Sequence, residues 1–305
     1  MQCSFPTSLR RRRFLSQIYM MQLPSGVKWI KGTAEGREWL RRLPARVVAC
    51  SRKWELTVGM PFENSFVSVV YPATRRDGTG AVLKIQWPHH ESDHEHEALR
   101  LWNGQGAIRL LDYDDEHHAL LLERCESGEP LSTLGIDAAL DVFMTLLPRL
   151  WRPAGPPFTS LHEEAGAWIE QMPLTWEHGG RPFEIRLLDL ALESLDRLRQ
   201  SQGPQVLLHQ DLHANNVLRA QREPWLVIDP KPLVGEREFS LVAAIRGDEL
   251  GTGRAALVRR LDTLTSSLGV DRERARLWTL GQTLAWCEGP HAAEHIEKAR
   301  WLAEI

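Results

Sequence analysis

The sequence predicts an α+β protein with a small β-rich lobe followed by a larger helical lobe. Short apolar runs bounded by turn residues occupy positions 56–123, with one helical stretch among them. The segment ESGEP at 126–130 interrupts this pattern, and helical periodicity dominates from position 137 onward. A chain of 305 residues is long enough to give each lobe its own core.

In the first lobe, apolar spacing predicts a helix over 39–54 and then an order β-β-β-α-β-β. In the second strand, Val67, Val69 and Tyr71 share one face, and the sequence DGTG at 77–80 is a strong turn signal. Pro88 ends the third strand and can open a helix that runs to about Asn103. The predicted strands are 56–61, 66–72, 81–85, 108–113 and 119–123.

The second lobe is expected to be mostly helical, with short apolar runs around position 210. Gly203 and Pro204 stop one helix just before those runs. The predicted helices are 137–151, 158–171, 182–200, 237–246, 254–268, 272–286 and 291–302.

Composition excludes several classes of protein. The formal charge of −3 argues against a general polyanion binder, which is usually basic. No segment has the apolar length of a membrane span. The N-terminal RRRFL (11–15) resembles a twin-arginine export signal, but its apolar stretch is short and no cleavage site follows. We expect residues 1–20 to be a disordered extension or a mis-assigned start. The scattered cysteines, Cys3, Cys50, Cys125 and Cys287, indicate reduced thiols and a cytoplasmic protein.

Polar side chains suited to catalysis are concentrated between positions 209 and 229. His209, Asp211 and Asn216 lie in one short segment, and Asp229 closes an apolar run that follows. Phosphoryl transfer from a magnesium nucleotide needs a carboxylate to orient the attacking hydroxyl and oxygen ligands to hold the metal. Asp211, Asn216 and Asp229 suit these tasks, so the segment indicates a kinase active site.

From about Trp29 to its end, the chain resembles the aminoglycoside phosphotransferases, bacterial relatives of protein kinases. The likeness is to the streptomycin 6-phosphotransferase and hydroxyurea-resistance kinase group in particular. It is carried by AVLKI (81–85), ALRLWNGQGAIRLLDYD (98–114), LLLER (120–124), LHQDLHANNVL (208–218) and WLVIDPKPLVGERE (225–238). The resemblance implies a bilobal protein-kinase-like fold, with a nucleotide-binding lobe (21–124), a hinge (125–130) and a helical lobe (131–305) carrying the catalytic loop and the acceptor site.

The resemblance also implies roles for individual residues. Asp211 would be the catalytic carboxylate, and Asn216 and Asp229 would ligate Mg²⁺. Lys84 would reach the phosphates of ATP, paired with Glu95 on the following helix. The adenine would contact the hinge backbone near Glu123 and Cys125. The implied activity is transfer of the γ-phosphate of ATP, or of GTP, to a hydroxyl of a streptomycin-like or hydroxyurea-like small molecule, which confers antibiotic resistance.

Three departures from the family pattern leave alternatives open. Gln210 replaces a glycine beside the catalytic aspartate, Ser240 replaces a bracing aspartate, and the loop 61–66 lacks glycine, although the amides of Asn64 and Ser65 could still contact phosphate. These departures motivate a degenerate nucleotide-binding protein without transfer activity as one alternative. A kinase for a metabolic alcohol is another.

Two local patterns offer competing interpretations in the segment that follows the third strand. Ser92 and Glu95 also fit a helix capping box, which would occupy the Glu95 carboxylate. His90 and His94 have a spacing that can hold zinc on a helix, although dense helix-surface charge is usually only solvated.

Overall fold

The computed structural model describes residues 23–63 and 65–305. The predicted N-terminal extension (1–20), with its arginine run, lies outside the described residues, as does Asn64. The described chain divides into two compact units. The first holds the described residues up to His96 together with Ile108–Arg124, and the second holds Glu97–Ala107 and Cys125–Ile305. What each unit binds remains a prediction.

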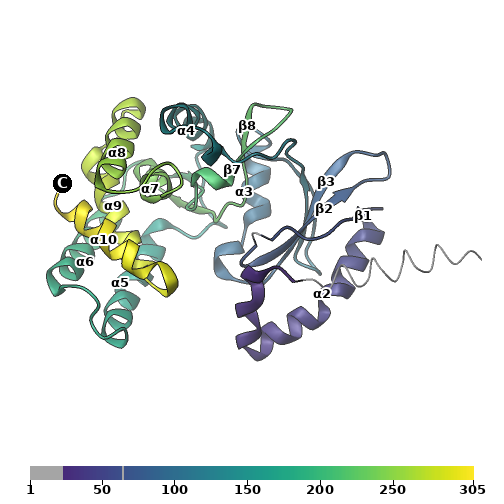
Figure 1. Ribbon diagram of the computed structural model, residues 1–305, viewed down its shortest axis with the longest axis horizontal. Helices are drawn as coiled ribbons and strands as arrows, with labels where there is room; N and C mark the ends of the chain where they lie inside the picture. Colours follow the sequence, from purple (N-terminus) through teal and green to yellow (C-terminus); the bar gives the residue numbers. More distant parts are fainter. Residues whose placement is uncertain (1–22, 64) are drawn as a thin grey trace, which may run out of the picture. The chain divides into compact units, whose positions relative to one another are not determined.

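The first unit is built on an antiparallel sheet with strand order β1-β2-β3-β5-β4 (Figure 1). In the longest pairing, β2 and β3 run from Ser68 opposite Gln86 to Thr74 opposite Gly80. The turn that joins them is held by the Asp77 carboxylate, which accepts hydrogen bonds from the backbone and hydroxyl of Thr79. The strands are β1 (Thr57–Val58), β2 (Ser68–Thr74), β3 (Gly80–Gln86), β4 (Leu110–Asp114) and β5 (Ala119–Glu123).

Helix α2 (Ala34–Lys53) packs on this sheet, and η1 (Ser25–Gly32) packs on α2 (Figure 1). Thr33 caps α2 by accepting a hydrogen bond from Gly36 N. Gly36 is required because a Cβ there would lie 1.8 Å from the Ile30 carbonyl oxygen. Along the strands, every second residue belongs to the core between the helix and the sheet, because successive side chains point to opposite faces. It contains Val27, Ile30, Trp39, Leu43, Val47, Cys50, Val69, Tyr71, Leu83, Ile85 and Ala119.

The predicted helix from Pro88 to Asn103 is wrong at its start. A short 3₁₀ turn, η2 (His90–Ser92), comes first, and α3 spans only Glu95–Trp102. His94 between them has a φ of 64°, a left-handed conformation that an α-helix cannot contain. Because α3 starts at Glu95 and the Ser92 N–H donates to the His89 carbonyl, the alternative in which Ser92 and Glu95 form a capping box does not hold. The Ser92 hydroxyl donates to the carbonyls of Trp87 and His89.

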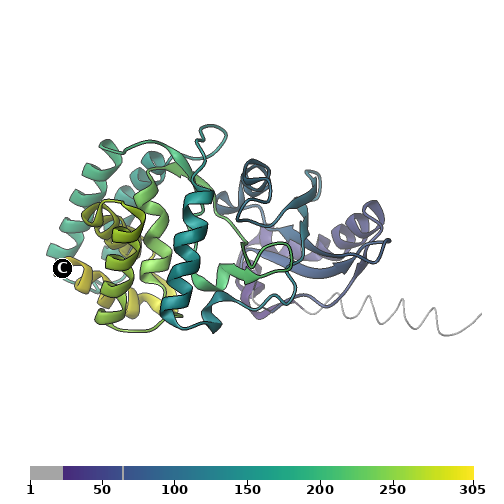
Figure 2. The same cartoon turned by 90° about the horizontal axis from the view of Figure 1, so that it is seen from above.

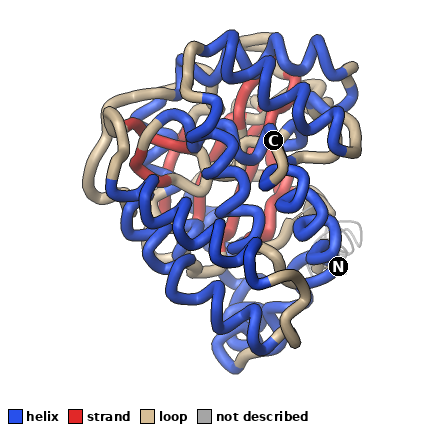
Figure 3. The backbone as a smooth tube through the Cα atoms, turned by 90° about the vertical axis from the view of Figure 1, so that its left-hand side faces the viewer, coloured by secondary structure: helices blue, strands red, loops and turns tan. Residues whose placement is uncertain are grey.

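The second unit is mainly helical (Figures 2 and 3). Helix α9 lies at its centre, in contact with α5, α6, α7, α8 and α10, and its Trp278 is fully buried. The predicted helix 237–246 is divided into a 3₁₀ turn, η5, and a short α7. The elements are η3 (Leu131–Thr133), α4 (Ile136–Leu150), α5 (Leu161–His178), α6 (Ile185–Gln200), η5 (Arg237–Leu241), α7 (Val242–Arg246), α8 (Arg254–Leu268), α9 (Arg272–Ala285), η6 (Gly289–His291) and α10 (Ala292–Ala303).

Short strands frame the segment that carries the candidate catalytic residues. Strand β6 (Val206–Leu208) pairs with β9 (Leu233–Gly235), and β7 (Val217–Arg219) pairs with β8 (Trp225–Val227). The 3₁₀ turn η4 (Ala214–Asn216) leads into β7. The candidate residues therefore lie in connections whose ends are fixed by strand pairing. None of the helices within the described ranges combines the length and apolar character that crossing a bilayer requires.

Candidate active site

His209 joins the two segments of the candidate site. Its Nε2 lies 2.8 Å from the Ile228 carbonyl oxygen, and its own carbonyl oxygen accepts a hydrogen bond from Lys231 N at 3.0 Å. Burial lowers the pKa of His209 to about 4. The ring is therefore neutral near pH 7, and we assign its proton to Nε2 because a carbonyl can only accept. His209 therefore links the chain before Asp211 to the chain around Asp229.

Asp211 and Asn216 are fixed to each other through the backbone. The Asn216 side-chain nitrogen donates to the Asp211 carbonyl oxygen at 2.9 Å. The Asn216 carbonyl oxygen in turn accepts from Ile228 N at 2.9 Å, one residue before Asp229. Together with the bonds of His209, these bonds join the backbone around Asp211, Asn216 and Asp229 into one hydrogen-bonded frame.

Gln210 and Asp229 both adopt left-handed backbone conformations, with φ of 62° and 57°. For residues other than glycine, such conformations cost about 1–3 kcal/mol, and they persist where surrounding structure enforces them. Gln210 thus has a backbone conformation that a glycine would adopt without this cost.

Positive charge surrounds the Asp211 carboxylate. Burial by itself raises the pKa of Asp211, but Lys231, His213 and Arg246 outweigh burial and hold the pKa below its usual value. Lys231 makes the direct contact, with Nζ 3.2 Å from Oδ2 of Asp211. Asp211 is therefore ionised at neutral pH, which is the state that can align a hydroxyl.

A second layer of charged groups supports this arrangement. His213 Nδ1 lies 3.2 Å from Oε1 of Glu249, which also accepts a hydrogen bond from Ala214 N. Burial lowers the pKa of His213, but the Glu249 and Asp211 carboxylates raise it above its usual value. The buried Arg246 donates to Gln282 and lies 4.8 Å from the ring centroid of Trp286. Glu249 thus holds the 3₁₀ turn that delivers Asn216.

The donor set fits Mg²⁺ in type. Because the Asn216 side-chain nitrogen donates to the Asp211 carbonyl, its amide oxygen remains available as a metal ligand. Asp229 adds a carboxylate at the end of the same frame. Magnesium in nucleotide sites is held by one or two protein oxygens together with phosphates and water, so a cage of several carboxylates is not needed. Asn216 and Asp229 are the residues that would hold the ion.

In the first unit, Lys84 is paired with Glu95 as expected. Lys84 Nζ lies 2.5 Å from Oε2 of Glu95, and both side chains are almost fully buried. Gln86, which the sequence did not single out, donates to the same oxygen at 2.7 Å. Strand β3 supplies the lysine and the glutamine, and the first residue of α3 supplies the acid. The pairing formed although the helix starts later than predicted.

The two residues predicted to contact adenine, Glu123 and Cys125, lie on either side of the division between the units. Glu123 ends β5 in the first unit, where its carboxylate accepts a hydrogen bond from Arg109 N and its own N–H donates to the Arg109 carbonyl. Cys125 begins the second unit and is half-buried. The contact of both residues with adenine remains a prediction. Cys50 and Cys287 are buried free thiols, whereas Cys3 lies outside the described residues.

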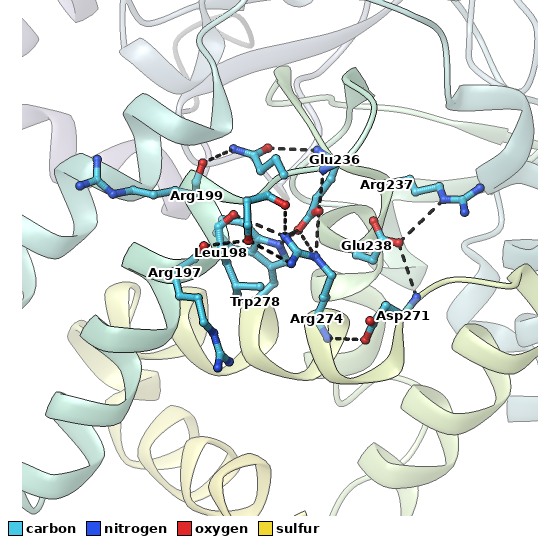
Figure 4. A network of polar contacts seen from close by, with 12 residues as sticks. Arg197, Leu198, Arg199, Glu236, Arg237, Glu238, Asp271, Arg274 and Trp278 are labelled. Carbon is cyan, nitrogen blue, oxygen red and sulfur yellow. Dashed lines mark hydrogen bonds and ion pairs between the residues drawn. The ribbon is translucent and has the colours of Figure 1, made fainter.

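Ser240, the expected weak point, is itself well bonded. Its hydroxyl accepts from Trp151 Nε1 at 3.0 Å and donates to the Arg237 carbonyl. Nearby bracing comes from Glu236, whose carboxylate receives the guanidinium of Arg274 at 2.8 Å and the indole N–H of Trp278 (Figure 4). Glu236 thereby fastens the chain after β9 to α9. This buried network is one that the sequence analysis did not anticipate.

The zinc alternative has no support in the described chain. His90 lies in η2 and His94 in the left-handed residue before α3, so the helical spacing that motivated the pair is absent. No group of three or more His, Cys, Asp or Glu side chains suited to a metal occurs among residues 23–63 and 65–305.

Sequence reasoning missed several residues beside Asp211, namely Lys231, Arg246, Glu249 and Trp286. Only Lys231 had a usable signal, because it follows Asp229 by two residues in IDPK. The others come from α7, the loop after it and the end of α9, so only the tertiary fold brings them to the catalytic loop.

Comparison with known proteins agrees with this geometry. Residues 53–288 match the family model described as aminoglycoside/hydroxyurea antibiotic resistance kinase. The chain is 41% identical to a streptomycin 6-kinase of Streptomyces griseus, over 83% of this chain and 84% of that one. It is 38% identical to a hydroxyurea phosphotransferase of Kitasatospora aureofaciens, over 93% of this chain and 84% of the relative.

The fold has solved counterparts as well. A choline kinase from Streptococcus pneumoniae superposes with a TM-score of 0.63 at 16% identity, covering 86% of this chain and 99% of that one. At this identity the likeness concerns the fold alone, which is kinase-like. Taken with the sequence relatives, it confirms the expected α+β, bilobal kinase-like class. The chain belongs to the aminoglycoside/hydroxyurea antibiotic resistance kinase family.

Proposed function

We propose that this protein transfers the γ-phosphate of ATP to a hydroxyl of a streptomycin-like aminoglycoside or of hydroxyurea, and so inactivates the antibiotic. Relatives at 41% and 38% identity carry the names streptomycin 6-kinase and hydroxyurea phosphotransferase. Both names describe phosphorylation of a small molecule. We infer that the acceptor of this chain is of the same kind.

The observation that carries the proposal is the shared backbone frame of Asp211, Asn216 and Asp229. A carboxylate, an amide and a second carboxylate are fixed by the hydrogen bonds of His209, Asn216 and Ile228. Phosphoryl transfer depends almost entirely on positioning and electrostatics, so a rigid frame of this composition suits it.

Each residue has a proposed task. Asp211, kept ionised by its cationic neighbours, orients the acceptor hydroxyl and receives its proton as the new phosphate ester forms. Asn216 and Asp229 would hold the magnesium, which would neutralise charge on the phosphates. Lys84, kept in place by Glu95 and Gln86, contacts the α- and β-phosphates. The backbone near Glu123 and Cys125 receives the adenine.

The test is ATP consumption by the purified protein with streptomycin, other aminoglycosides, hydroxyurea, choline or no acceptor. We expect consumption that depends on streptomycin or hydroxyurea, with a phosphorylated product detected by mass spectrometry. Transfer only to a metabolic alcohol such as choline would refute the proposed acceptor class. Binding of ATP without transfer to any acceptor would favour a degenerate nucleotide-binding protein instead.

The magnesium assignment has its own test. Asp229→Asn keeps the size of the side chain and removes its charge. We expect a much higher Mg²⁺ concentration for half-maximal binding of an ATP analogue, measured by titration calorimetry. An unchanged Mg²⁺ requirement would count against Asp229 as a ligand.

A further inference from the structure

Lys231 makes an unusual set of contacts for a lysine in a loop. Its ammonium lies 3.2 Å from Oδ2 of Asp211 and 5.0 Å from the ring centroid of Trp286. Its backbone N–H donates to the His209 carbonyl at 3.0 Å. The side chain is only 21% exposed. The residue is held at its backbone by His209 and at its ammonium by Asp211 and Trp286. A lysine that merely solubilised the surface would leave its head in water.

The position of this ammonium matters because Asp211 has two equivalent oxygens. A carboxylate that can rotate freely presents either oxygen, or neither, to an incoming hydroxyl. An ion pair at Oδ2 restricts that rotation and leaves Oδ1 available to accept a hydrogen bond from a hydroxyl. An error of about 1 Å in such an alignment can lower a rate by about 100-fold.

We propose that Lys231 is a positioning residue for the transfer step, which fixes the orientation of the Asp211 carboxylate while Trp286 fixes Lys231. The inference rests on the proposed function, since it concerns the hydroxyl that Asp211 aligns. No covalent step passes through Lys231. Its contribution is to the geometry and charge of Asp211 in the reacting complex.

The first unit offers a matched control. Lys53 Nζ lies 2.7 Å from Oδ2 of Asp114 and 5.5 Å from the ring centroid of Trp54. It thus has the same two kinds of contact as Lys231, with a carboxylate to which no catalytic task is assigned. Lys53→Met therefore reports what losing such a contact set does to the fold alone.

The experiment compares Lys231→Met, Lys231→Arg and Lys53→Met in the full-length protein, with the acceptor found in the panel above. For Lys231→Met we expect kcat to fall about 10- to 100-fold, with little change in the KM for ATP or in the affinity for a non-hydrolysable ATP analogue. Lys231→Arg, which keeps the charge, should recover part of the loss. Lys53→Met should leave kcat unchanged.

Combination with Asp211→Asn shows whether Lys231 acts through Asp211. We expect Lys231→Met to cause no further loss of kcat in that background, because the oriented carboxylate is already gone. A full further loss would overturn the positioning role, as would an unchanged kcat in Lys231→Met alone. A loss of analogue affinity equal to the loss of kcat would place Lys231 in the nucleotide site and would also overturn it.

Failure of the inference and failure of the proposed function give different results. If the wild-type protein turns over an antibiotic and Lys231→Met matches it, the inference is wrong and the function stands. If the folded wild-type protein binds the ATP analogue but transfers phosphate to no antibiotic of the panel, the proposed function fails, and the inference fails with it.

Discussion

Each of the two units contains a lysine paired with a carboxylate among the candidate residues, and the two pairs differ in burial. In the first unit, Lys84 Nζ lies 2.5 Å from Oε2 of Glu95, and the two side chains are 6% and 1% exposed. In the second unit, Lys231 Nζ lies 3.2 Å from Oδ2 of Asp211, and the two side chains are 21% and 18% exposed. The first pair joins a strand to the start of a helix, and the second joins two loops.

The two pairs are expected to differ in how much they stabilise the fold. A buried ion pair is costly to break, because the charge that remains is left in the interior without its opposite charge. The pair at Asp211 is partly exposed, so water can offset more of the loss when that pair is broken. We therefore expect loss of the first pair to destabilise the protein more than loss of the second.

The largest effect is expected for Asp211, the carboxylate of the partly exposed pair. Asp211→Asn removes the charge that aligns the acceptor hydroxyl, so kcat should fall about 10²- to 10⁴-fold. Analogue binding and thermal stability should change little. Steady-state kinetics and analogue titration check this, and turnover within a factor of two of the wild type would rule out the catalytic assignment.

Glu95→Ala should break the buried ion pair between Lys84 and Glu95. It leaves the buried Lys84 ammonium without its carboxylate and removes the acceptor for Gln86, so the free energy of unfolding should fall by about 3–5 kcal/mol. Urea denaturation measures the change. Glu38→Ala, which removes the exposed pairs with Arg41 and Arg42, is the control and should have a much smaller effect. Equal effects of the two substitutions would contradict the distinction drawn from burial.

The pH dependence of stability should report His209. Its pKa is about 4 in the fold and near 6.5 when unfolded, so the unfolded state binds the extra proton between these values. Stability is therefore full above about pH 6.5 and should fall by about 3 kcal/mol as the pH drops to 4. In His209→Asn, the free energy of unfolding should lose this part of its dependence on pH. Urea denaturation at a series of pH values between 4 and 7 measures it. An identical slope in both proteins would refute the buried neutral state.

The smallest effect is expected at Gln210. Glycine adopts a φ of 62° without strain, and Nε2 of Gln210 is buried with no partner among the described residues. Gln210→Gly should therefore stabilise the protein by about 1 kcal/mol. The control Gln171→Gly, within helix α5, should destabilise it by a similar amount. Two changes of the same sign would show that backbone strain at Gln210 is not significant.

Local sequence signals were sufficient where an element is regular. Helix α8 spans Arg254–Leu268 as predicted, because its apolar periodicity ends at Gly269, which adopts a left-handed φ of 61°. The same reasoning failed at Pro88, where a helix start was inferred from proline alone. There the chain is held by hydrogen bonds of the Ser92 hydroxyl that no periodicity encodes.

The candidate site divides in the same way. Asp211, Asn216, Asp229 and Lys84 were identified from motifs, because their spacing along the chain is short and chemically constrained. Arg246, Glu249 and Trp286 were missed, since they carry no local pattern and reach the catalytic loop from elements of the helical unit. Gln86 was missed although it is adjacent to a predicted strand, because its role depends on the position of Glu95.

The class of fold, the family and a set of candidate site residues could be predicted from the amino-acid sequence. These predictions follow from periodicity and from motifs that lie within short stretches of chain. The state of the candidate residues depends on the folded chain, in which His209 is neutral, Asp211 is ionised beside Lys231, and Lys84 is buried with Glu95. The reason is physical: pKa values and ion-pair strengths depend on burial and on charges from distant parts of the chain, which folding alone brings together.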